Sequence, residues 1–487
     1  MRRSVVSLSC VFLGLLACHS ARRDPFAGVG PLAGADAIVE GRATATATDT
    51  VDAKMSIRLL RARWALRTDR DESRDFWSDV ALLDTQNAER AARSMDERTF
   101  AVALRTLMEG QPGAAAVAFG LLHAAATDSL VRGRARIGLT MALSYDSDWQ
   151  AMSRLQAIPN VADSIPGSLA VAAGVERWAR ALSMVPTPVF EIPDQPVVLP
   201  MRRSFLGTPV VTIRINGKEH EFWLDTGASM TLLSTDVAIA AGAKLAADDT
   251  LALGVVGGHI EARAIYIDSM AIGPVTVRGL GAALVSPEAL RFDQKLVNGL
   301  RTTVPIDGMI GTDVLRHLDV VMDAKAGTIT LRRPRRLSGA RRNLFWVGYP
   351  VVRLVTPDGR PLLFGLDTGA EGTYVTNTLL KKAPRTPIAM RRMSLVGLGS
   401  DSKRTAKSTW IARQIPVSDG NYAIMLNNVP IMPPQRWTFV DFDGVIGSDI
   451  ALATRMHLDF TNGVFDIRAS DAPNVYYDGA PDVKVVY

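Results

Sequence analysis

Apolar residues in the first part of the chain recur at the three- and four-residue spacing of amphipathic helices. Two such stripes consist of Ile57, Leu60, Trp64 and Leu66, and of Phe100, Leu104 and Leu107. Gln111-Pro112-Gly113 interrupts the pattern, which resumes over residues 114–126 and again over residues 130–142. We therefore predict a domain of short helical hairpins over residues 53–184. The alternation of short helices and turns resembles tetratricopeptide units but has no fixed period. The domain could therefore serve only for packing or could bind a protein partner.

The pattern changes after residue 184. A Pro-rich stretch, residues 185–200, predicts an extended linker, and short strands and turns follow it. Two of these turns, Asn216-Gly217 and Asp358-Gly359, are strong hairpin signals. Each glycine stands 8 residues before an Asp-Thr-Gly triplet, at Asp225 and Asp367 (225 − 217 and 367 − 359). The second half of the chain is therefore an internal duplication.

Matching stretches downstream extend the duplication. Asp307-Gly308-Met309-Ile310-Gly311-Thr312-Asp313 corresponds to Asp443-Gly444-Val445-Ile446-Gly447-Ser448-Asp449, at an offset of 136 (443 − 307). The Asp-Thr-Gly triplets have an offset of 142 (367 − 225), so the first copy is six residues longer in its middle. Copies that keep their turns and vary between them share one supersecondary plan.

The two aspartates carry the clearest chemistry in the sequence. Two carboxyl groups held about 3 Å apart cannot both ionise, so they share a proton and together supply a base and an acid. Hydrolysis of a peptide bond by water needs both functions. A glycine in each loop allows the two loops to approach closely.

With these elements, residues 205–470 resemble two tandem aspartic peptidase lobes of the retropepsin-like type, carried in one chain as in pepsin-like enzymes. The resemblance implies a small β-barrel in each lobe and one active site between them, with Asp225 and Asp367 as catalytic residues. It also implies supporting residues in the loops and beneath them: Thr226, Gly227, Thr368, Gly369, Ile310, Gly311, Ile446 and Gly447. The fold class expected is multidomain, α followed by all-β, with the two lobes forming one bilobal unit.

A glycine-rich stretch lies between the catalytic loop and the Ile-Gly stretch of each copy, where a substrate-covering hairpin, or flap, would belong. The flap glycines predicted in this way are Gly254, Gly257, Gly258, Gly397 and Gly399. An ordinary turn is the alternative.

Two positions depart from the family pattern. Ala228 and Ala370 follow the triplets where pepsin-like lobes often place a hydroxyl residue, and the loss of a donor to the ionised form raises the lower pKa of the dyad. We therefore expect an optimum at milder acidity than that of pepsin. Glu371 resembles an acidic retropepsin residue whose usual partner is an arginine, and Arg455 is one candidate for that partner.

The N-terminus predicts export. Arg2 and Arg3 precede an apolar run, residues 5–17, that is too short to span a membrane. The run ends in a bacterial lipobox-like sequence before Cys18, the expected site of lipidation. We expect an exported protein that is lipid-anchored to a bacterial membrane. A plain signal peptide is the alternative.

The amino-acid composition argues against several other kinds of chemistry. The only cysteines, Cys10 and Cys18, lie in the targeting segment, so disulfides and a cysteine nucleophile are excluded. The net charge is +6, with arginines concentrated between the repeats in what reads as a solvated linker, and nucleic acid is not an expected partner. His317 and His457 share a His-Leu-Asp triplet but do not correspond in the repeat, so we expect neither metal nor cofactor. Ser229 lacks the context of a serine nucleophile.

The predicted segments follow from these boundaries: 1–17 signal, 18–52 tether, 53–184 helical domain, 185–200 linker, 201–333 first lobe, 334–343 Arg-rich linker, 344–470 second lobe and 471–487 tail. The leading hypothesis is an aspartic endopeptidase that cleaves peptides or proteins. The alternative is a non-catalytic peptide-binding module. Pairing of the two lobes within one monomer is favoured over pairing between chains.

Overall fold

The computed structural model describes residues 57–60, 64, 66–67, 74–155, 168–204, 207–255, 258–295, 301–339, 341–394, 406–433, 435–437 and 439–470. The predicted signal, tether and C-terminal tail, with Cys18, lie outside the described residues, as do Gly257, Gly397 and Gly399. No helix within these ranges is both long and apolar enough to cross a membrane.

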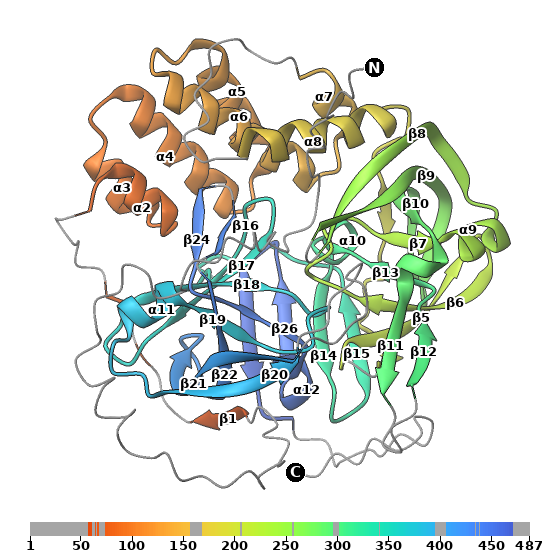
Figure 1. Ribbon diagram of the computed structural model, residues 1–487. Coiled ribbons are helices and arrows are strands. Elements are labelled where there is room, and N and C mark those ends of the chain that lie inside the picture. The colour runs from red at the N-terminus through yellow and green to blue at the C-terminus, as the bar shows by residue number, and fades with distance from the viewer. Residues whose placement is uncertain are drawn as a thin grey trace, which may run out of the picture.

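The helical region forms the upper layer of the molecule in Figure 1. Its helices are α2 (Phe76–Ala81), α3 (Thr85–Ala91), α4 (Met95–Met108), α5 (Pro112–Ala125), α6 (Ser129–Tyr145), α7 (Trp149–Ser153) and α8 (Ser168–Ala181). Ser94 caps α4 through the N–H of Glu97, and the Glu97 carboxylate accepts the N–H of Arg93 in return. Phe100, Leu104 and Leu107 are buried, so the predicted helical stripe is confirmed.

The first predicted stripe is wrong as a helix. Ile57–Leu60 is a strand, β1, which pairs antiparallel with β22 of the second lobe. So short a segment, with three apolar residues and Arg58, fits either period, and here an available sheet edge decides the outcome. The segment expected to open the helical domain therefore adds a strand to a distant lobe.

The first lobe is a closed barrel. Strands β5, β6, β13, β7, β10 and β9 form a ring in that order, and β2, β4 and β8 pair at its edges. The elements of this lobe are β4 (Arg202–Arg203), β5 (Pro209–Ile215), β6 (Lys218–Leu224), β7 (Leu232–Ser234), α9 (Thr235–Ala241), β8 (Lys244–Val255), β9 (Gly258–Ile272), β10 (Val275–Val285), a 3₁₀ turn (Pro287–Leu290), β11 (Arg291–Lys295), β12 (Arg301–Pro305), β13 (Gly308–Ile310), α10 (Thr312–Leu315), β14 (Asp319–Asp323) and β15 (Thr328–Arg332). The Asn216-Gly217 turn is present, with both residues at positive φ.

The second lobe repeats this ring with β17, β18, β25, β19, β22 and β21. Its elements are β16 (Leu344–Trp346), β17 (Pro350–Val355), β18 (Pro361–Leu366), β19 (Tyr374–Thr376), α11 (Asn377–Lys382), β20 (Ile388–Ser394), β21 (Ala406–Ser418), β22 (Ala423–Met432), β23 (Gln435–Trp437), β24 (Val440–Phe442), β25 (Gly444–Ile446), α12 (Ser448–Ala453), β26 (Arg455–Asp459) and β27 (Val464–Arg468). The predicted fold class, a helical region followed by two β-barrel lobes, is confirmed.

A five-stranded sheet joins the lobes in the order β27, β26, β14, β15, β3. Its central pairing, β14 with β26, sets Val321 opposite His457, two positions related by the repeat offset of 136. The outermost strand, β3 (Val197–Pro200), comes from the predicted Pro-rich linker, and β2 (Val189–Glu191) pairs with β10. That segment is extended, as predicted, but it belongs to two sheets instead of linking domains freely.

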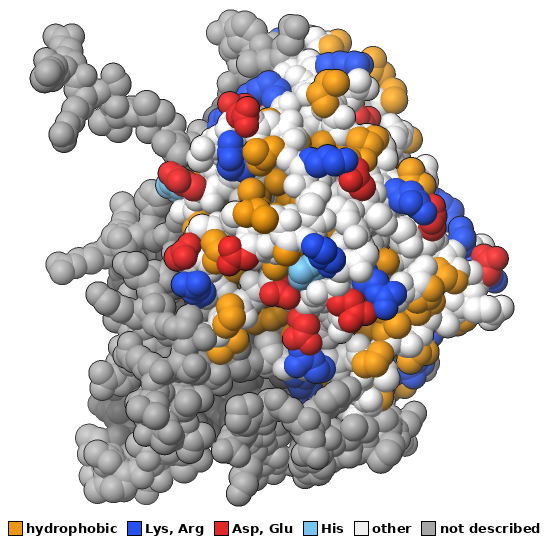
Figure 2. Space-filling model, turned by 90° about the vertical axis from the view of Figure 1, so that its right-hand side faces the viewer, with side chains coloured by type: hydrophobic (Ala, Val, Ile, Leu, Met, Phe, Trp, Pro, Cys, Tyr) orange, Lys and Arg blue, Asp and Glu red, His pale blue; other side chains and the backbone are white. Residues whose placement is uncertain are grey.

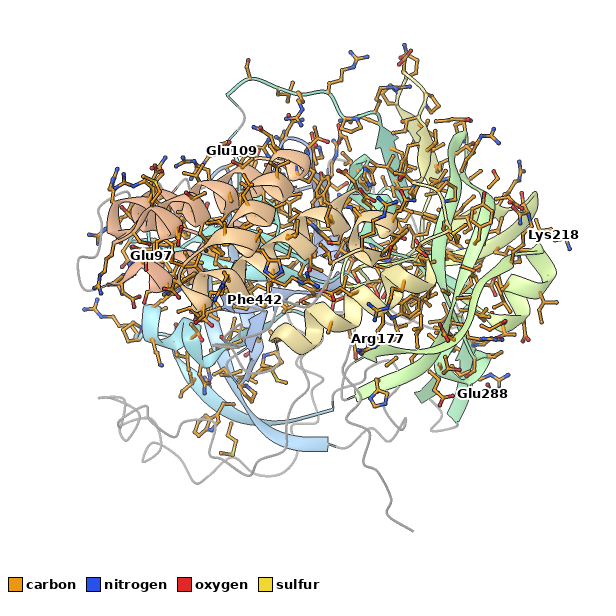
Figure 3. All side chains as sticks on the ribbon, turned by 90° about the horizontal axis from the view of Figure 1, so that it is seen from above. Glu97, Glu109, Arg177, Lys218, Glu288 and Phe442 are labelled. Carbon is orange, nitrogen blue, oxygen red and sulfur yellow. The ribbon has the colours of Figure 1, made fainter. Side chains whose placement is uncertain are left out.

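The helical region packs on both lobes. Helices α2 to α6 share a hydrophobic core with residues of the second lobe, among them Phe439 and Phe442. Figure 3 shows Phe442 beneath these helices when the molecule is viewed from above. Helices α7 and α8 share a separate core with the first lobe.

The sequence predicted that the arginines between the repeats are solvated, but several of them contact other parts of the chain. Arg332 pairs with Asp319 at 3.7 Å, and Arg333 pairs with Asp194 at 3.3 Å. Arg336 donates to the Gly110 carbonyl at 3.0 Å, and Arg342 donates to the Thr461 carbonyl at 2.8 Å. These side chains connect the linker to the interlobe sheet and to the end of α4.

The outer face of the first lobe mixes both signs of charge (Figure 2). Ion pairs within this lobe include Arg214–Glu219 at 2.8 Å and Lys244–Asp268 at 2.8 Å. On the face drawn, basic and acidic side chains are interspersed and no single sign gathers into a patch.

Candidate active site

The two Asp-Thr-Gly loops begin where β6 and β18 end. The N–H of Asp225 donates to the Ile310 carbonyl at 3.0 Å, and the N–H of Asp367 donates to the Ile446 carbonyl at 2.9 Å. In each lobe the strand bearing the aspartate thus pairs with the strand that ends in Ile-Gly. The two stretches that matched in the sequence lie side by side in space.

The Ile-Gly glycines make close backbone contact with the loops. A Cβ on Gly311 would lie 2.6 Å from the main chain of Met230, and Gly447 is similarly pressed against the main chain of Gly372. A side chain at either position would displace the loop that carries the aspartate.

Thr226 and Thr368 join the loops across the lobe interface. The N–H of Thr226 donates to Oγ1 of Thr368 and the N–H of Thr368 donates to Oγ1 of Thr226, each at 3.0 Å. Each hydroxyl in turn donates to the opposite lobe, Thr226 to the Leu366 carbonyl at 3.0 Å and Thr368 to the Leu224 carbonyl at 2.7 Å. Both threonines are fully buried, so these four bonds lock the two loops in one relative position.

Gly227 and Gly369 face the opposite aspartate. A Cβ on Gly369 would lie 2.5 Å from Cγ of Asp225, and a Cβ on Gly227 would collide with the carboxylate of Asp367. The structure therefore brings Asp225 and Asp367 together at a single site, and only glycine leaves room for them.

The environments of the two carboxyl groups differ. Oδ1 of Asp225 accepts the N–H groups of Gly227 and Ala228 at 2.8 and 3.2 Å, and Oδ1 of Asp367 accepts those of Gly369 and Ala370 at 3.0 Å each. Asp367 is buried, whereas Asp225 is partly exposed. Oδ2 of Asp367 accepts no hydrogen bond from any donor in the described part of the chain.

Burial raises the pKa of Asp225, and the N–H of Gly227 opposes that rise. Burial and then the charge of Asp225 raise the pKa of Asp367 well above its usual value. The two carboxyl groups therefore titrate as one pair, which favours a shared proton. Such a pair offers one ionised and one protonated carboxyl group at mildly acidic pH.

A second carboxyl group supports each loop, and sequence reasoning did not assign it a role. Asp313 accepts the N–H and hydroxyl of Thr231, both at 2.9 Å, and Asp449 accepts those of Thr373 at 2.9 and 2.7 Å. Burial raises the pKa of each aspartate to about 6. Thr231 and Thr373 are related by the offset of the catalytic loops, 142, and that spacing could have identified them (373 − 231).

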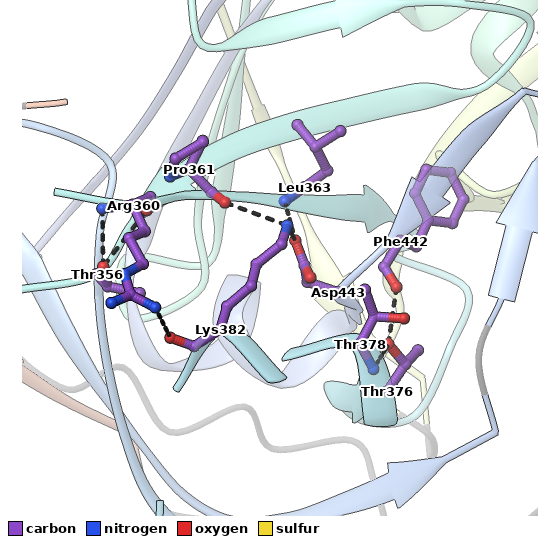
Figure 4. A network of polar contacts seen from close by, with 9 residues as sticks. All are labelled: Thr356, Arg360, Pro361, Leu363, Thr376, Thr378, Lys382, Phe442 and Asp443. Atoms are coloured by element: carbon purple, nitrogen blue, oxygen red, sulfur yellow. Dashed lines mark hydrogen bonds and ion pairs between the residues drawn. The ribbon is translucent and has the colours of Figure 1, made fainter. Parts of the chain in front are cut away.

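Asp443 and its repeat counterpart Asp307 stabilise the strands below. Figure 4 shows Asp443 between Lys382, at 2.6 Å, and the N–H of Leu363, at 2.8 Å. Burial raises the pKa of Asp443, and Lys382 opposes the rise. Asp307 accepts the N–H of Glu221 at 3.0 Å, but it is only half-buried and lies 3.8 Å from His220.

Tyr349 also lies near the dyad, although no sequence signal identified it. It is 2% exposed, and a Cβ on Gly365 would lie 2.8 Å from its ring. Burial and the charge of Asp367 raise its pKa well above the usual value, so it stays a neutral phenol beside the carboxyl groups.

The predicted flap positions are described only in the first lobe. Gly254 and Gly258 lie in the long hairpin of β8 and β9, where Gly254 pairs with His259 and Gly258 with Val255. The corresponding hairpin of the second lobe consists of β20 and β21, which pair from Ile388–Ala412 to Ser394–Ala406. Both copies therefore place a hairpin between the catalytic loop and the Ile-Gly stretch.

The pairing of Glu371 with Arg455 stays a prediction. Arg455 is exposed at the start of β26. Strand β26 pairs with β14 in the interlobe sheet, and this pairing sets the position of Arg455.

His317 and Ser229, which the sequence did not favour as functional residues, have no role in the chemistry of the dyad. His317 packs against the rings of Phe190 and Tyr145, with centroids 4.4 and 5.9 Å away. Burial lowers the pKa of His317 to about 3, so it is neutral. Ser229 is buried and its hydroxyl has no partner among the described residues. Within the same residues, no group of three or more His, Cys, Asp or Glu side chains could hold a metal ion.

Residues 211–314 match the model of the aspartyl protease family. The match covers the first lobe from β5 to α10, and the second lobe repeats the same closed barrel. The resemblance to retropepsin-like aspartic peptidases is therefore confirmed, and family and fold together support a peptidase-like function.

Among solved structures, the chain is similar to a retropepsin-like aspartic protease from Rickettsia conorii. The alignment has 16% sequence identity and a TM-score of 0.19, and it covers 30% of this chain and 93% of that one. With so low a TM-score, this similarity supports no conclusion about the present chain. A comparison with curated proteins finds no match.

Proposed function

We propose that the protein is an aspartic endopeptidase in which Asp225 and Asp367 form the catalytic dyad. The observation that carries this proposal is the contact of each loop glycine with the aspartate of the opposite lobe, which brings both carboxyl groups to one point. The four threonine hydrogen bonds support it, because they hold the two carboxyl groups in a fixed relation.

The chemistry follows from the difference between the carboxyl groups. Asp225, the more exposed and more acidic of the two, takes a proton from an attacking water. Asp367, which retains the shared proton, donates it toward the carbonyl oxygen of the peptide bond as the tetrahedral intermediate forms. Proton transfer then returns the pair to its starting state when the amine leaves.

The raised pKa values give the pH dependence its direction. Activity requires one proton on the pair, so it rises as the more acidic carboxyl group ionises and falls as the second one does. Because burial moves both steps upward, the optimum lies at mild acidity. An optimum well below pH 3 contradicts this account.

The test is hydrolysis of an unbiased peptide library by the soluble protein lacking residues 1–18, compared with Asp225→Asn and Asp367→Asn. Each substitution is expected to reduce the rate at least about a hundredfold, because each removes one half of the acid–base pair. Cleavage that survives both substitutions overturns the proposal. Specific peptide binding without turnover across pH 3 to 8 identifies the peptide-binding alternative instead.

We also propose that a single chain suffices for the site, since both loops that meet there come from one chain. Activity per molecule should then be independent of protein concentration. Loss of specific activity on dilution, with a dimer detected by light scattering, contradicts this. Export and anchoring through Cys18 remain part of the proposal, and Cys18→Ser should release the protein from the membrane fraction.

A further inference from the structure

The helical region contacts the first-lobe hairpin close to its turn. The indole ring of Trp178, in α8, is fully buried, and its N–H donates to the carbonyl of Ala252 at 3.0 Å. Ala252 lies in β8 (Lys244–Val255), three residues before the end of the strand. Among the described strands, β8 is the last in the order of its sheet. Helix α8 thus contacts an edge strand of the lobe.

Apolar packing extends this contact along the hairpin. Trp178 belongs to one buried core with Leu251 and Leu253 of β8 and with Ala262 and Ala264 of β9. Figures 1 and 3 both show α8 beside the β8–β9 hairpin, with the labelled Arg177 marking the helix in Figure 3.

Helix α8 is itself held firmly. Its Glu176 forms a buried ion pair with Arg136 of α6, with N–O distances of 2.8 and 2.9 Å. The end of α6 is fixed to the first lobe, because Arg316 donates to the Ser144 carbonyl at 2.8 Å and to the Ser147 hydroxyl at 3.0 Å. The hairpin therefore rests against an element tied to the same lobe at a second point.

Among the described side chains, the helical region packs on the second lobe at residues outside its hairpin. The second-lobe residues that share a core with the helical region are Phe345, Val347, Tyr349, Val351, Leu363, Phe439, Val440 and Phe442, as far as the described residues go. None of them belongs to β20 or β21. Met390 of β20 is 60% exposed.

We propose that Trp178 is a positioning residue, through which α8 fixes the β8–β9 hairpin, the hairpin expected to cover a bound peptide. This inference rests on the proposed function for its consequence in catalysis, but the restraint on β8 is independent of it. A hairpin over the cleft binds an extended peptide through its main chain, so a fixed hairpin lowers the cost of ordering on binding. The helical region then supports peptide binding instead of shielding the cleft.

Hydrogen–deuterium exchange of the protein lacking residues 1–18 tests the restraint without requiring activity. Trp178→Phe keeps an aromatic ring and removes the N–H donor, and Trp178→Ala removes the packing as well. Amides of residues 248–264 are expected to exchange about fivefold faster in the Phe variant and faster still in the Ala variant, with residues 388–394 and 406–418 unchanged. Arg180→Ala, at an exposed position of the same helix, is the matched control and should leave both hairpins unchanged.

Peptide kinetics supply the second measurement. A positioning role predicts a several-fold rise in KM for Trp178→Phe with kcat changed less than about twofold, because the acid–base groups are untouched. Unchanged exchange of residues 248–264 in a folded Trp178→Phe protein overturns the proposal, and so does an equal increase in both hairpins. If the wild-type protein hydrolyses no peptide, the proposed function fails, while the exchange result still decides whether Trp178 restrains the hairpin.

Discussion

The two lobes share one barrel and one set of loop contacts, yet their surroundings differ at the aspartates of the dyad, at Asp307 and Asp443, and at the hairpin. The first lobe has Asp225 partly exposed, Asp307 only half-buried and its hairpin packed under α8. The second lobe has Asp367 buried and Asp443 buried beside Lys382. The duplicated contacts maintain the geometry of the dyad, while the differences give its two carboxyl groups different proton affinities.

The largest expected effect comes from breaking what the lobes share. Gly227→Ala and Gly369→Ala each place a methyl group against the opposite aspartate, so each should reduce peptide hydrolysis more than about a hundredfold. The two variants should be equally damaging, because the contacts are reciprocal. Rates are measured with a fluorogenic peptide taken from the library profile.

Gly120→Ala is the matched control for these variants. Gly120 lies in α5, where a Cβ meets nothing within 4 Å. This change should leave activity intact and raise the free energy of unfolding by about 0.5–1 kcal/mol. Full activity in Gly369→Ala is incompatible with the proposed proximity of the two carboxyl groups.

The next prediction concerns a difference between the lobes, at Asp443 and its counterpart Asp307. Lys382→Met leaves the buried carboxylate of Asp443 without a countercharge and should cost about 3–5 kcal/mol of unfolding free energy at pH 7. The loss should be smaller at pH 5 than at pH 7, because burial raises the pKa of Asp443 and the protonated form needs no countercharge. His220→Phe, the comparable change beside half-buried Asp307, should cost less than about 1 kcal/mol. Urea denaturation at both pH values measures all three quantities, and equal losses in the two lobes refute this difference.

The smallest expected effect tests a feature that both lobes share, the buried aspartate that supports each catalytic loop. Asp313 and Asp449 have pKa values raised to about 6, so each favours its protonated form in the folded protein. Each group therefore stabilises the fold most below pH 4, and about 3 kcal/mol of that contribution is lost as the pH rises from about 4 to 6. Asp313→Asn and Asp449→Asn should each remove that part of the pH dependence. Unfolding free energies between pH 3.5 and 7 provide the measurement, and an unaltered slope in either variant contradicts the assignment.

Much of the fold followed from local patterns. The stripe of Phe100, Leu104 and Leu107 predicted a helix because its spacing and length left no alternative. Ile57–Leu60 was predicted to be helical and is a strand, since a segment of four residues satisfies either period and the edge of β22 was not visible in the sequence. The Pro-rich segment was correctly expected to be extended, but its pairing partners lie more than 75 residues away.

The candidate site divides in the same way. Asp225, Asp367 and the Ile-Gly stretches were identified by counting offsets between the two copies, because a duplication preserves spacing. The suggested Glu371–Arg455 pair stays a prediction, since an ion pair depends on where side chains meet in space and not on their order in the chain. Tyr349 and Trp178 carried no signal, because each is one aromatic residue among many until the fold sets it beside the dyad or the hairpin.

The sequence by itself determined that two equivalent carboxyl groups exist and which strands and turns carry them, because turn chemistry and hydrophobic period are local properties. Only the tertiary structure decided that Asp367 is the more deeply buried partner and that α8 packs against the β8–β9 hairpin. Burial and long-range packing depend on what surrounds a residue in space, and duplicated segments of one chain need not have the same neighbours.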